Sequence, residues 1–202
     1  MAPIPYRIVF VRHGETDYNA EGRLQGQRDI PLNRRGRAQA SAIGRALRLA
    51  MPGAIAALEA AEAFVASPLA RTRQTMELAR ASLGLPPERY GLEPALKELT
   101  FGEWEGLTWP QVARRDPPGA RAREADKWNF APPGGESYAM LAARLQPWLD
   151  SVRSDRFVVS HGGVARALMT LIAGVSPQAA ENADIWQGRA ILFEDGGLRW
   201  VG

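Results

Sequence analysis

The stretch that decides the fold is residues 9–16, "VFVRHGET", where an apolar run turns into a polar loop. Residues 8–11 form a short, β-branched segment closed by a turn, a pattern that indicates a fully buried strand. The run ends on Arg12 and His13, with a glycine directly behind. The chain has only two histidines, and the other, His161, follows a second apolar run in "FVVSHGG". The repeated pattern indicates that two strands aim a histidine at the same place.

The composition limits the classes of protein. The 202 residues suit a single domain, 1–202, with a small cap inserted at about 102–136. The absence of cysteine excludes disulfides, zinc–thiolate sites, iron–sulfur clusters and cysteine nucleophiles. There is no run of 18 apolar residues and no signal-peptide pattern. We therefore expect a cytoplasmic protein with no membrane partner.

The formal charge of +3 is small and spread along the chain. Its densest cluster, residues 34–37, lies at the start of an expected helix and is typical of a solvated helix face. We therefore expect no nucleic-acid partner. Nearly all the cations are arginines, whose planar guanidinium groups suit a phosphate ligand.

Predicted strands and helices alternate along the chain. Strands are expected at 8–11, 63–66, within 92–99 and at 157–160, and a terminal hairpin at 190–193 and 198–201. Helices are expected at 33–50, from 67 to about 84, at about 137–152 and at 164–173. This order predicts an α/β fold, a three-layer α/β/α arrangement with a mostly parallel central sheet and a small inserted cap segment.

Four polar clusters follow predicted strands, and parallel strands would bring them to the edge where ligands bind. The clusters are Arg12-His13-Gly14, residues 67–71 with Arg71, Lys97-Glu98, and residues 160–163 with His161. Together they supply two imidazoles, two guanidinium groups and a carboxylate, a set that suits a phosphate ester. One imidazole could attack phosphorus, and the carboxylic acid could protonate the leaving oxygen.

Each of these residues also has a purely structural interpretation. A histidine after a strand often only satisfies hydrogen bonds, and Arg71 could be a surface residue of a helix. Glu98 could simply act as a cap or pair with Lys97. The chain has no GxxxxGK[ST] or GxGxxG loop, which disfavours the nucleotide-binding folds that use them. His13, His161 and nearby acids could also form the metal site of a metallophosphatase. Against this, the histidines lack the HExxH spacing, and the flanking arginines would repel a cation.

The ordered motifs resemble the histidine phosphatase superfamily, the phosphoglycerate-mutase-like enzymes with an RHG motif. The resemblance spans about residues 7–174 and is carried by successive blocks: "VRHGETDYN", "GRLQGQRDIPLNRRGRAQA", "SPLARTRQT", "LKELTFGEWEG", "PPGGESY" and "VVSHGGVARAL". It implies phosphohistidine chemistry that needs no cofactor and no metal.

The resemblance also implies roles for matching residues. His13 would be the nucleophile, with the Gly14 carbonyl fixing its tautomer, and Glu98 would be the proton donor. The resemblance implies that the phosphate is bound by Arg12, Arg71, His161, Gly162 and Asn19, with weaker indications for Thr16 and Gln25. From the residues themselves, two adjacent guanidinium groups should keep His13 neutral.

The family contains both phosphatases and mutases. The mutases carry Arg-His-Tyr after the catalytic glutamate, whereas this chain has Leu99-Thr100-Phe101. The segment looks more like the phosphatases, including α-ribazole phosphatase-like and broad-specificity ones, so we expect a phosphoric monoester hydrolase acting on a small phosphorylated metabolite. A cofactor-dependent phosphoglycerate mutase and a non-catalytic protein that binds phosphorylated ligands are the alternatives. A homodimer is possible.

Specificity should lie in the cap. Four aromatic residues there could line the site but more often pack a cap onto its domain: Trp104, Trp109, Trp128 and Phe130. Four arginines could touch a second anionic group or face solvent: Arg114, Arg115, Arg121 and Arg123. The sequence leaves both alternatives open.

Overall fold

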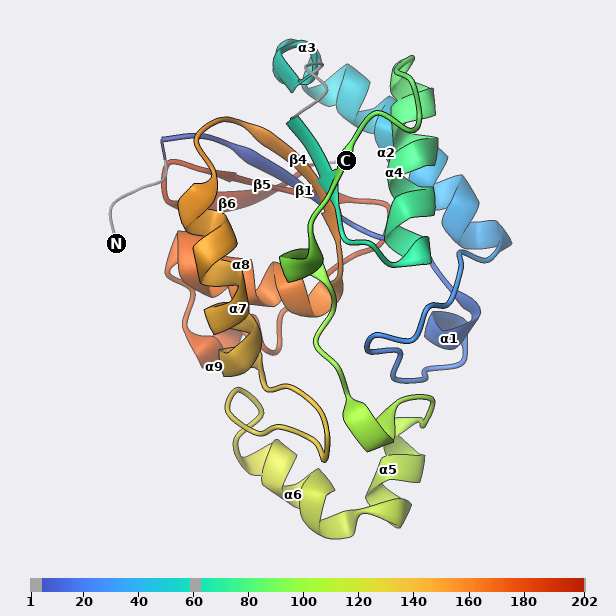
Figure 1. Ribbon diagram of the computed structural model, residues 1–202, viewed down its shortest axis with the longest axis vertical. Helices are drawn as coiled ribbons and strands as arrows, with labels where there is room; N and C mark the ends of the chain where they lie inside the picture. Colours follow the sequence, from blue (N-terminus) through green and yellow to red (C-terminus); the bar gives the residue numbers. More distant parts are fainter. Residues whose placement is uncertain (1–4, 59–62, 202) are drawn as a thin grey trace.

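The computed structural model describes residues 5–58 and 63–201, so parts of the expected domain at 1–4, 59–62 and 202 lie outside it. A central sheet has the strand order β3-β2-β4-β1-β5-β6 (Figure 1). The strands are β1 (Ile8–Arg12), β2 (Phe64–Ala66), β3 (Gly91–Leu92), β4 (Arg156–Ser160), β5 (Ala190–Glu194) and β6 (Gly197–Val201). The first four are parallel to one another, and β5 and β6 form the antiparallel hairpin at one edge. The predicted α/β fold is confirmed.

Strand β1 is buried on both faces, as its unbroken apolar sequence predicts. Successive side chains point to opposite faces of a sheet, so Ile8 and Phe10 enter one hydrophobic core and Val9 and Val11 enter the other. Helices must therefore cover both faces, which gives the three layers.

One face is covered by helices α2 (Arg34–Ala50), α3 (Pro52–Leu58) and α4 (Ala70–Leu83). The side chain of Asn33 accepts a hydrogen bond from the Gly36 N–H and so begins α2 at the predicted place. The other face is covered by α7 (Tyr138–Ser151), α8 (Gly162–Ala173) and α9 (Pro177–Ala180). No helix among the described residues is long and apolar enough to span a bilayer.

The cap lies at the end of the molecule farthest from α3 (Figure 1). It contains the 3₁₀ helix η3 (Gly102–Trp104) and the short helices α5 (Trp109–Arg115) and α6 (Pro117–Ala125). Trp104 stacks on Phe130 and its indole N–H donates to Asp116, so this tryptophan holds the cap's own small core together.

The structure differs from the sequence prediction in two connections. Residues 92–99 contain little strand, because β3 ends at Leu92 and the 3₁₀ helix η2 (Pro94–Leu96) follows. Pro94 cannot donate to a strand ladder, and the Glu93 side chain caps η2 by accepting from the Ala95 N–H. The helix expected from residue 67 begins at Ala70, because the Ser67 N–H still bonds to Val159 of the neighbouring strand. Three short helices were missed, namely α1 (Asp17–Ala20), α3 and α9.

The packing of α2 against α4 yields a test of the fold. A methyl group on Gly44 would lie 2.5 Å from the carbonyl oxygen of Ala79, which is backbone and cannot move aside. Overpacking lowers the stability of a protein by about 1–3 kcal/mol. This cost outweighs the gain of roughly 1 kcal/mol in helix propensity when alanine replaces glycine. We therefore expect Gly44→Ala to lower the free energy of unfolding, measured by urea denaturation. The control is Gly53→Ala in α3, where the added methyl meets nothing within 4 Å and stability should not fall. Equal stability of the two variants would show that the helices are not packed this closely.

Candidate active site

Pairing of β1 with β4 brings the two histidines together. Arg12 is in register with Ser160, and the His13 N–H donates to the Ser160 carbonyl at 2.9 Å. The next residue on each strand is therefore a histidine, and the two ring centroids lie 5.2 Å apart with an interplanar angle of 63°. Both rings are almost completely buried, with exposed fractions of 2% and 0%. The structure thus places His13 and His161 close enough to contact one phosphoryl group.

The tautomer of His13 is fixed by its neighbour. The Nδ1 atom lies 2.7 Å from the Gly14 carbonyl oxygen, which can only accept, so Nδ1 carries the proton. The lone pair is then on Nε2, the atom that is free to act as a nucleophile. Residue 14 must be glycine, because a Cβ there would lie 2.3 Å from the carbonyl oxygen of Gly36 at the start of α2.

Two guanidinium groups lie beside the histidines, that of Arg71 buried and that of Arg12 half-buried. Arg71 donates to the carbonyl oxygens of Arg28 and Gly26 at 2.7 and 2.8 Å, and Arg12 donates to that of Ile185 at 2.7 Å. These partners are neutral, so the charges of the two arginines are held in place without being neutralised. Burial lowers the pKa of both, that of Arg71 to about 10. Such a site has a strong electrostatic preference for an anion.

The same surroundings keep both imidazoles neutral. Burial lowers the pKa of His13 well below 6.5, and the charges of Arg71 and Arg12 lower it further. The pKa of His161 is also lowered well below 6.5, first by burial and then by Arg71 and the His13 ring. The expectation that His13 is held neutral therefore agrees with the structure, although burial outweighs the charges as the cause.

Several buried polar atoms of the site have no hydrogen-bond partner among the residues that the structure describes. They are Nε of Arg12, Nε of Arg71 and Nδ1 of His161. The other ring nitrogen of His161 lies 2.8 Å from the Ser67 hydroxyl, which orients the ring. Buried donors are nearly always satisfied, so the two guanidinium Nε–H groups beside the cavity indicate a ligand with acceptor oxygens.

Glu98 lines the same cavity as His13, from a different part of the chain. Its Oε2 accepts from the Gly163 N–H at 3.1 Å and its Oε1 from its neighbour's N–H, that of Leu99, at 3.0 Å. A Cβ on Gly163 would lie 2.3 Å from Oε1, so the glycine makes room for the carboxylate at the first turn of α8. No ion pair joins Glu98 to Lys97 among the described residues, so that alternative is wrong. The alternative of a capping role agrees with the structure, because Glu98 accepts from an N–H of the first turn of α8.

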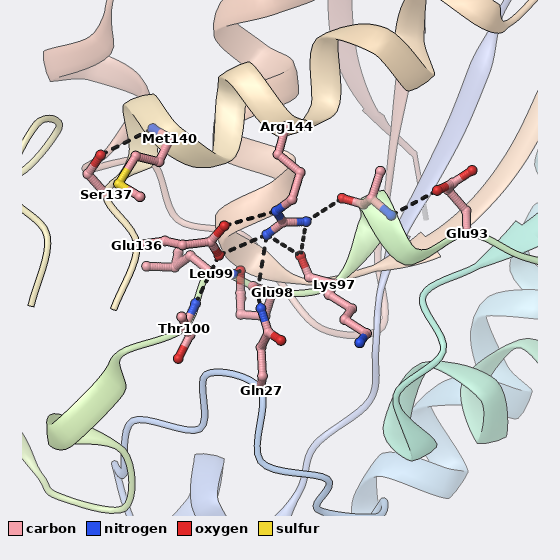
Figure 2. A network of polar contacts seen from close by, with 11 residues as sticks. Gln27, Glu93, Lys97, Glu98, Leu99, Thr100, Glu136, Ser137, Met140 and Arg144 are labelled. Atoms are coloured by element: carbon pink, nitrogen blue, oxygen red, sulfur yellow. Dashed lines mark hydrogen bonds and ion pairs between the residues drawn. The ribbon is translucent and has the colours of Figure 1, made fainter. Parts of the chain in front are cut away.

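The backbone that carries Glu98 is fixed by the network of Figure 2. Arg144 of α7 donates to the carbonyl oxygens of Ala95 and Lys97 at 2.6 and 3.2 Å. It also forms a two-point ion pair with Glu136, both contacts at 3.0 Å, and Glu136 accepts from the Thr100 N–H at 3.2 Å. The Gln27 side chain donates to the Glu98 carbonyl at 3.0 Å from the opposite side. This network makes an irregular segment rigid enough to position a carboxylate.

The loop after β1 supplies the remaining predicted residues. Asn19, Gln25 and Gly162 line the same cavity as His13, Arg12, Arg71 and Glu98. Thr16 does not line it: this threonine caps α1, and its hydroxyl contacts the side chains of Asn19 and Gln25 at 3.1 and 2.9 Å. Thr16 therefore acts by holding two lining residues in place.

The cavity is about 300 Å³ in volume and opens toward the cap. Of the four cap aromatics, Trp109 lines it, together with Phe101. Trp104 and Phe130 pack inside the cap, and Trp128 stacks on Tyr138. Of the four cap arginines, Arg123 lines the cavity. The sequence analysis missed several contributors: Arg23, Lys127, Tyr138 and Arg166 at the cavity wall, Gly163 at Glu98, and Arg144 behind it.

Comparison with known proteins gives a consistent result. The family described as "Histidine phosphatase superfamily (branch 1)" matches residues 8–197. The chain is 37% identical over 179 residues to glucosyl-3-phosphoglycerate phosphatase of Mycobacterium tuberculosis, covering 80% of this chain and 73% of that one. It is 38% identical over 175 residues to metal-independent phosphoserine phosphatase of Arabidopsis thaliana, covering 84% and 69%. A 2,3-bisphosphoglycerate-dependent phosphoglycerate mutase of Beijerinckia indica is 28% identical over 193 residues, covering 92% and 90%.

A comparison with solved structures leads to the same family as the comparison of sequences. The mycobacterial glucosyl-3-phosphoglycerate phosphatase complexed with VO3 superposes with a TM-score of 0.77 at 29% identity, covering 96% of each chain. The match of the family description to nearly the whole chain, together with this shared architecture, shows that the protein belongs to branch 1 of the histidine phosphatase superfamily.

Proposed function

We propose that the protein is a phosphoric monoester hydrolase that acts on a small phosphorylated metabolite through a phosphohistidine on His13. The observation that carries the proposal is a pair of buried neutral imidazoles next to two guanidinium groups whose partners are all neutral carbonyls. A phosphate ester supplies what this site lacks, namely negative charge and acceptor oxygens. Relatives named as phosphatases support the same class of reaction.

The residues suggest two steps. In the first, Nε2 of His13 attacks phosphorus while the bond from phosphorus to the ester oxygen breaks, and Glu98 gives its proton to the leaving oxygen. Arg12, Arg71 and His161 hold the phosphoryl oxygens, whose charge they spread in the transition state. In the second step Glu98 takes a proton from water, which attacks the phosphohistidine and releases orthophosphate. No step requires a metal ion or another cofactor.

A phosphoglycerate mutase is the less favoured alternative. Such an enzyme must exclude water and hold a bisphosphate for re-transfer, and the Arg-His-Tyr sequence of the mutases is absent after Glu98. The mutase relative also has a lower sequence identity, 28%, than the two phosphatases, at 37% and 38%. A non-catalytic binding protein is disfavoured because the nucleophile and the acid candidate are both in place. Among the phosphatases, an α-ribazole phosphatase-like or broad-specificity enzyme remains our prediction, as do a homodimer and a cytoplasmic location.

Removal of the nucleophile tests the proposal. We expect release of orthophosphate from p-nitrophenyl phosphate, 3-phosphoglycerate or phosphoserine in the presence of EDTA. Release should fall by several orders of magnitude in His13→Ala, because the covalent intermediate cannot form. Calorimetry should show that the variant still binds orthophosphate, which separates loss of chemistry from loss of the fold. Isomerisation of phosphoglycerate without release of phosphate would make the protein a mutase, and no turnover of any ester by the wild type would favour a binding protein.

The protonation state of the histidines gives a second prediction. Since the pKa of each ring is lowered, each stays neutral at pH 6.5 and takes up a proton only as the pH falls well below that value. The unfolded chain binds these protons first, so the free energy of unfolding should decrease as the pH falls below about 6.5. Because the chain has only two histidines, NMR of labelled imidazoles gives two signals, and His13→Gln assigns them. A midpoint near pH 6.5 for either ring would contradict this account of the site.

The role of Glu98 is tested by varying the leaving group. Glu98→Gln cannot donate a proton, so we expect a loss of roughly 10²–10⁴-fold with an alkyl phosphate such as phosphoserine. The p-nitrophenolate ion needs no proton to leave, so its release should be affected less. Stopped-flow measurements should then show one equivalent of p-nitrophenolate per enzyme followed by slow turnover, since Glu98 is also needed to activate water. Equal losses with both esters and no burst would show that Glu98 is not the proton donor.

A further inference from the structure

Three cations line the outer part of the catalytic cavity, beyond the residues assigned to the phosphate. They are Arg123 of α6, Lys127 just after α6, and Arg166 of α8. All three are half-buried, so they are enclosed by the cap and are not freely solvated surface charges. We call these three residues the outer cluster.

Each member of the outer cluster is held by a neutral group. Arg166 donates twice to the carbonyl oxygen of Ala183, at 3.1 and 2.9 Å. Lys127 donates to the carbonyl oxygen of Glu181 at 2.5 Å and to the Asn182 side chain at 3.0 Å. The guanidinium carbon of Arg123 lies 4.1 Å from the centre of the Trp109 ring. The three side chains are thus fixed in position by groups that carry no charge of their own.

None of the three takes part in an ion pair within the described residues, whereas Arg23 at the same cavity is paired with Glu21 at 2.5 Å. Burial lowers the pKa of Lys127, and the charges of Arg123 and Arg166 lower it further. Burial lowers the pKa of Arg123; Tyr138 and Glu181 act in the opposite direction, and Arg166 adds the smallest effect, which lowers it. Like charges that line one cavity repel one another, and an anion between them would relieve that repulsion.

The outer cluster is continuous with the phosphate site. A methyl group on Gly162 would lie 3.3 Å from Nη1 of Arg166 and 3.6 Å from Nε of Arg12, so these guanidinium groups flank the same glycine. The cavity wall carries one carboxylate, Glu98, against six cations: Arg12, Arg23, Arg71, Arg123, Lys127 and Arg166. A dianionic phosphate would offset Arg12 and Arg71, and Glu21 offsets Arg23. The charge of the outer cluster would remain.

We propose that the outer cluster binds a second anionic group of the substrate, a carboxylate or a second phosphate, close to the phosphate that is cleaved. This proposal rests on the phosphatase function and narrows its substrate class to small anionic phosphate esters. Arg166 bridges the two sites, Lys127 and Arg123 face the second anion from the cap, and Trp109 holds Arg123 in place. The cap therefore selects substrates by charge as well as by shape.

Matched pairs of esters isolate the second anion. We would measure kcat/KM for 3-phosphoglycerate against glycerol 3-phosphate, and for phosphoserine against phosphoethanolamine, because each pair differs by one carboxylate. Fructose 1,6-bisphosphate against fructose 6-phosphate tests a second phosphate in the same way. We expect at least one pair to favour the more anionic ester by roughly 10- to 100-fold, as charge-assisted hydrogen bonds are worth about 1.5–3 kcal/mol. Which pair responds identifies the second anion as a carboxylate or a phosphate.

Substitutions link this preference to the outer cluster. Lys127→Met and Arg123→Met should each lower the preference within the responding pair by roughly 10-fold or more, and Lys127→Arg should retain much of it. The matched control is Arg121→Met, on the same helix as Arg123 but exposed and outside the cavity, which should leave the preference unchanged. The preference is a ratio, so a variant with generally lower activity is still informative.

The outcomes separate this proposal from the proposed function. Hydrolysis of p-nitrophenyl phosphate with no preference in any pair would overturn the second-anion site and leave the phosphatase intact. A preference that Lys127→Met and Arg123→Met do not change would also overturn it. Absence of turnover with every ester, p-nitrophenyl phosphate included, would instead overturn the proposed function on which the inference rests.

Discussion

The parallel pairing of β1 with β4 is the constraint on which the site depends. Two adjacent parallel strands end at the same edge, and the register sets Arg12 opposite Ser160, so the residue that follows each strand is a histidine. The two rings meet without any side-chain interaction having to draw them together. Both strands are buried on both faces, and a slip of one residue would exchange the core-facing side chains. The cores on the two faces of the sheet therefore fix the geometry of the histidines.

The uncharged partners of the two arginines explain how the rest of the site is arranged. Burying an arginine is costly, and a carboxylate would be the usual remedy. Here Arg12 and Arg71 are held by carbonyl oxygens, and Glu98 accepts a hydrogen bond from the Gly163 N–H. A carboxylate paired with either arginine would occupy the place that we propose for the phosphate oxygens. Hydrogen bonds to uncharged carbonyl oxygens keep the guanidinium groups in position and leave their charge available for a ligand. Two members of the outer cluster, Lys127 and Arg166, are held by carbonyl oxygens in the same way.

The sequence predicted what depends on local pattern. The parallel core, the hairpin and the residues directly after β1, β2 and β4 follow from apolar runs and turns, and these residues line or border the cavity. Residues that reach the site from helix interiors were missed: Arg144 and Arg166 each look like an ordinary helix arginine in sequence. Nothing in their spacing indicates that Arg144 binds the carbonyl oxygens of the segment before Glu98, or that Arg166 lies close to Arg12. Thr16 shows the opposite limit, since its place beside the motif suggested a ligand contact, whereas it buttresses Asn19 and Gln25.

Glu98 shows why the acid candidate depends on long-range structure. The nucleophile follows a strand and inherits its position from the sheet, but Glu98 follows η2 and an irregular segment. That segment is positioned by Arg144 and Glu136 on one side and by Gln27 on the other, residues distant in sequence (Figure 2). The Gly163 N–H then donates a hydrogen bond to the Glu98 carboxylate at the start of α8, the helix that also carries Arg166. One helix thus contacts the acid candidate at its first turn and carries a member of the outer cluster one turn later, so the same element positions both groups at the cavity.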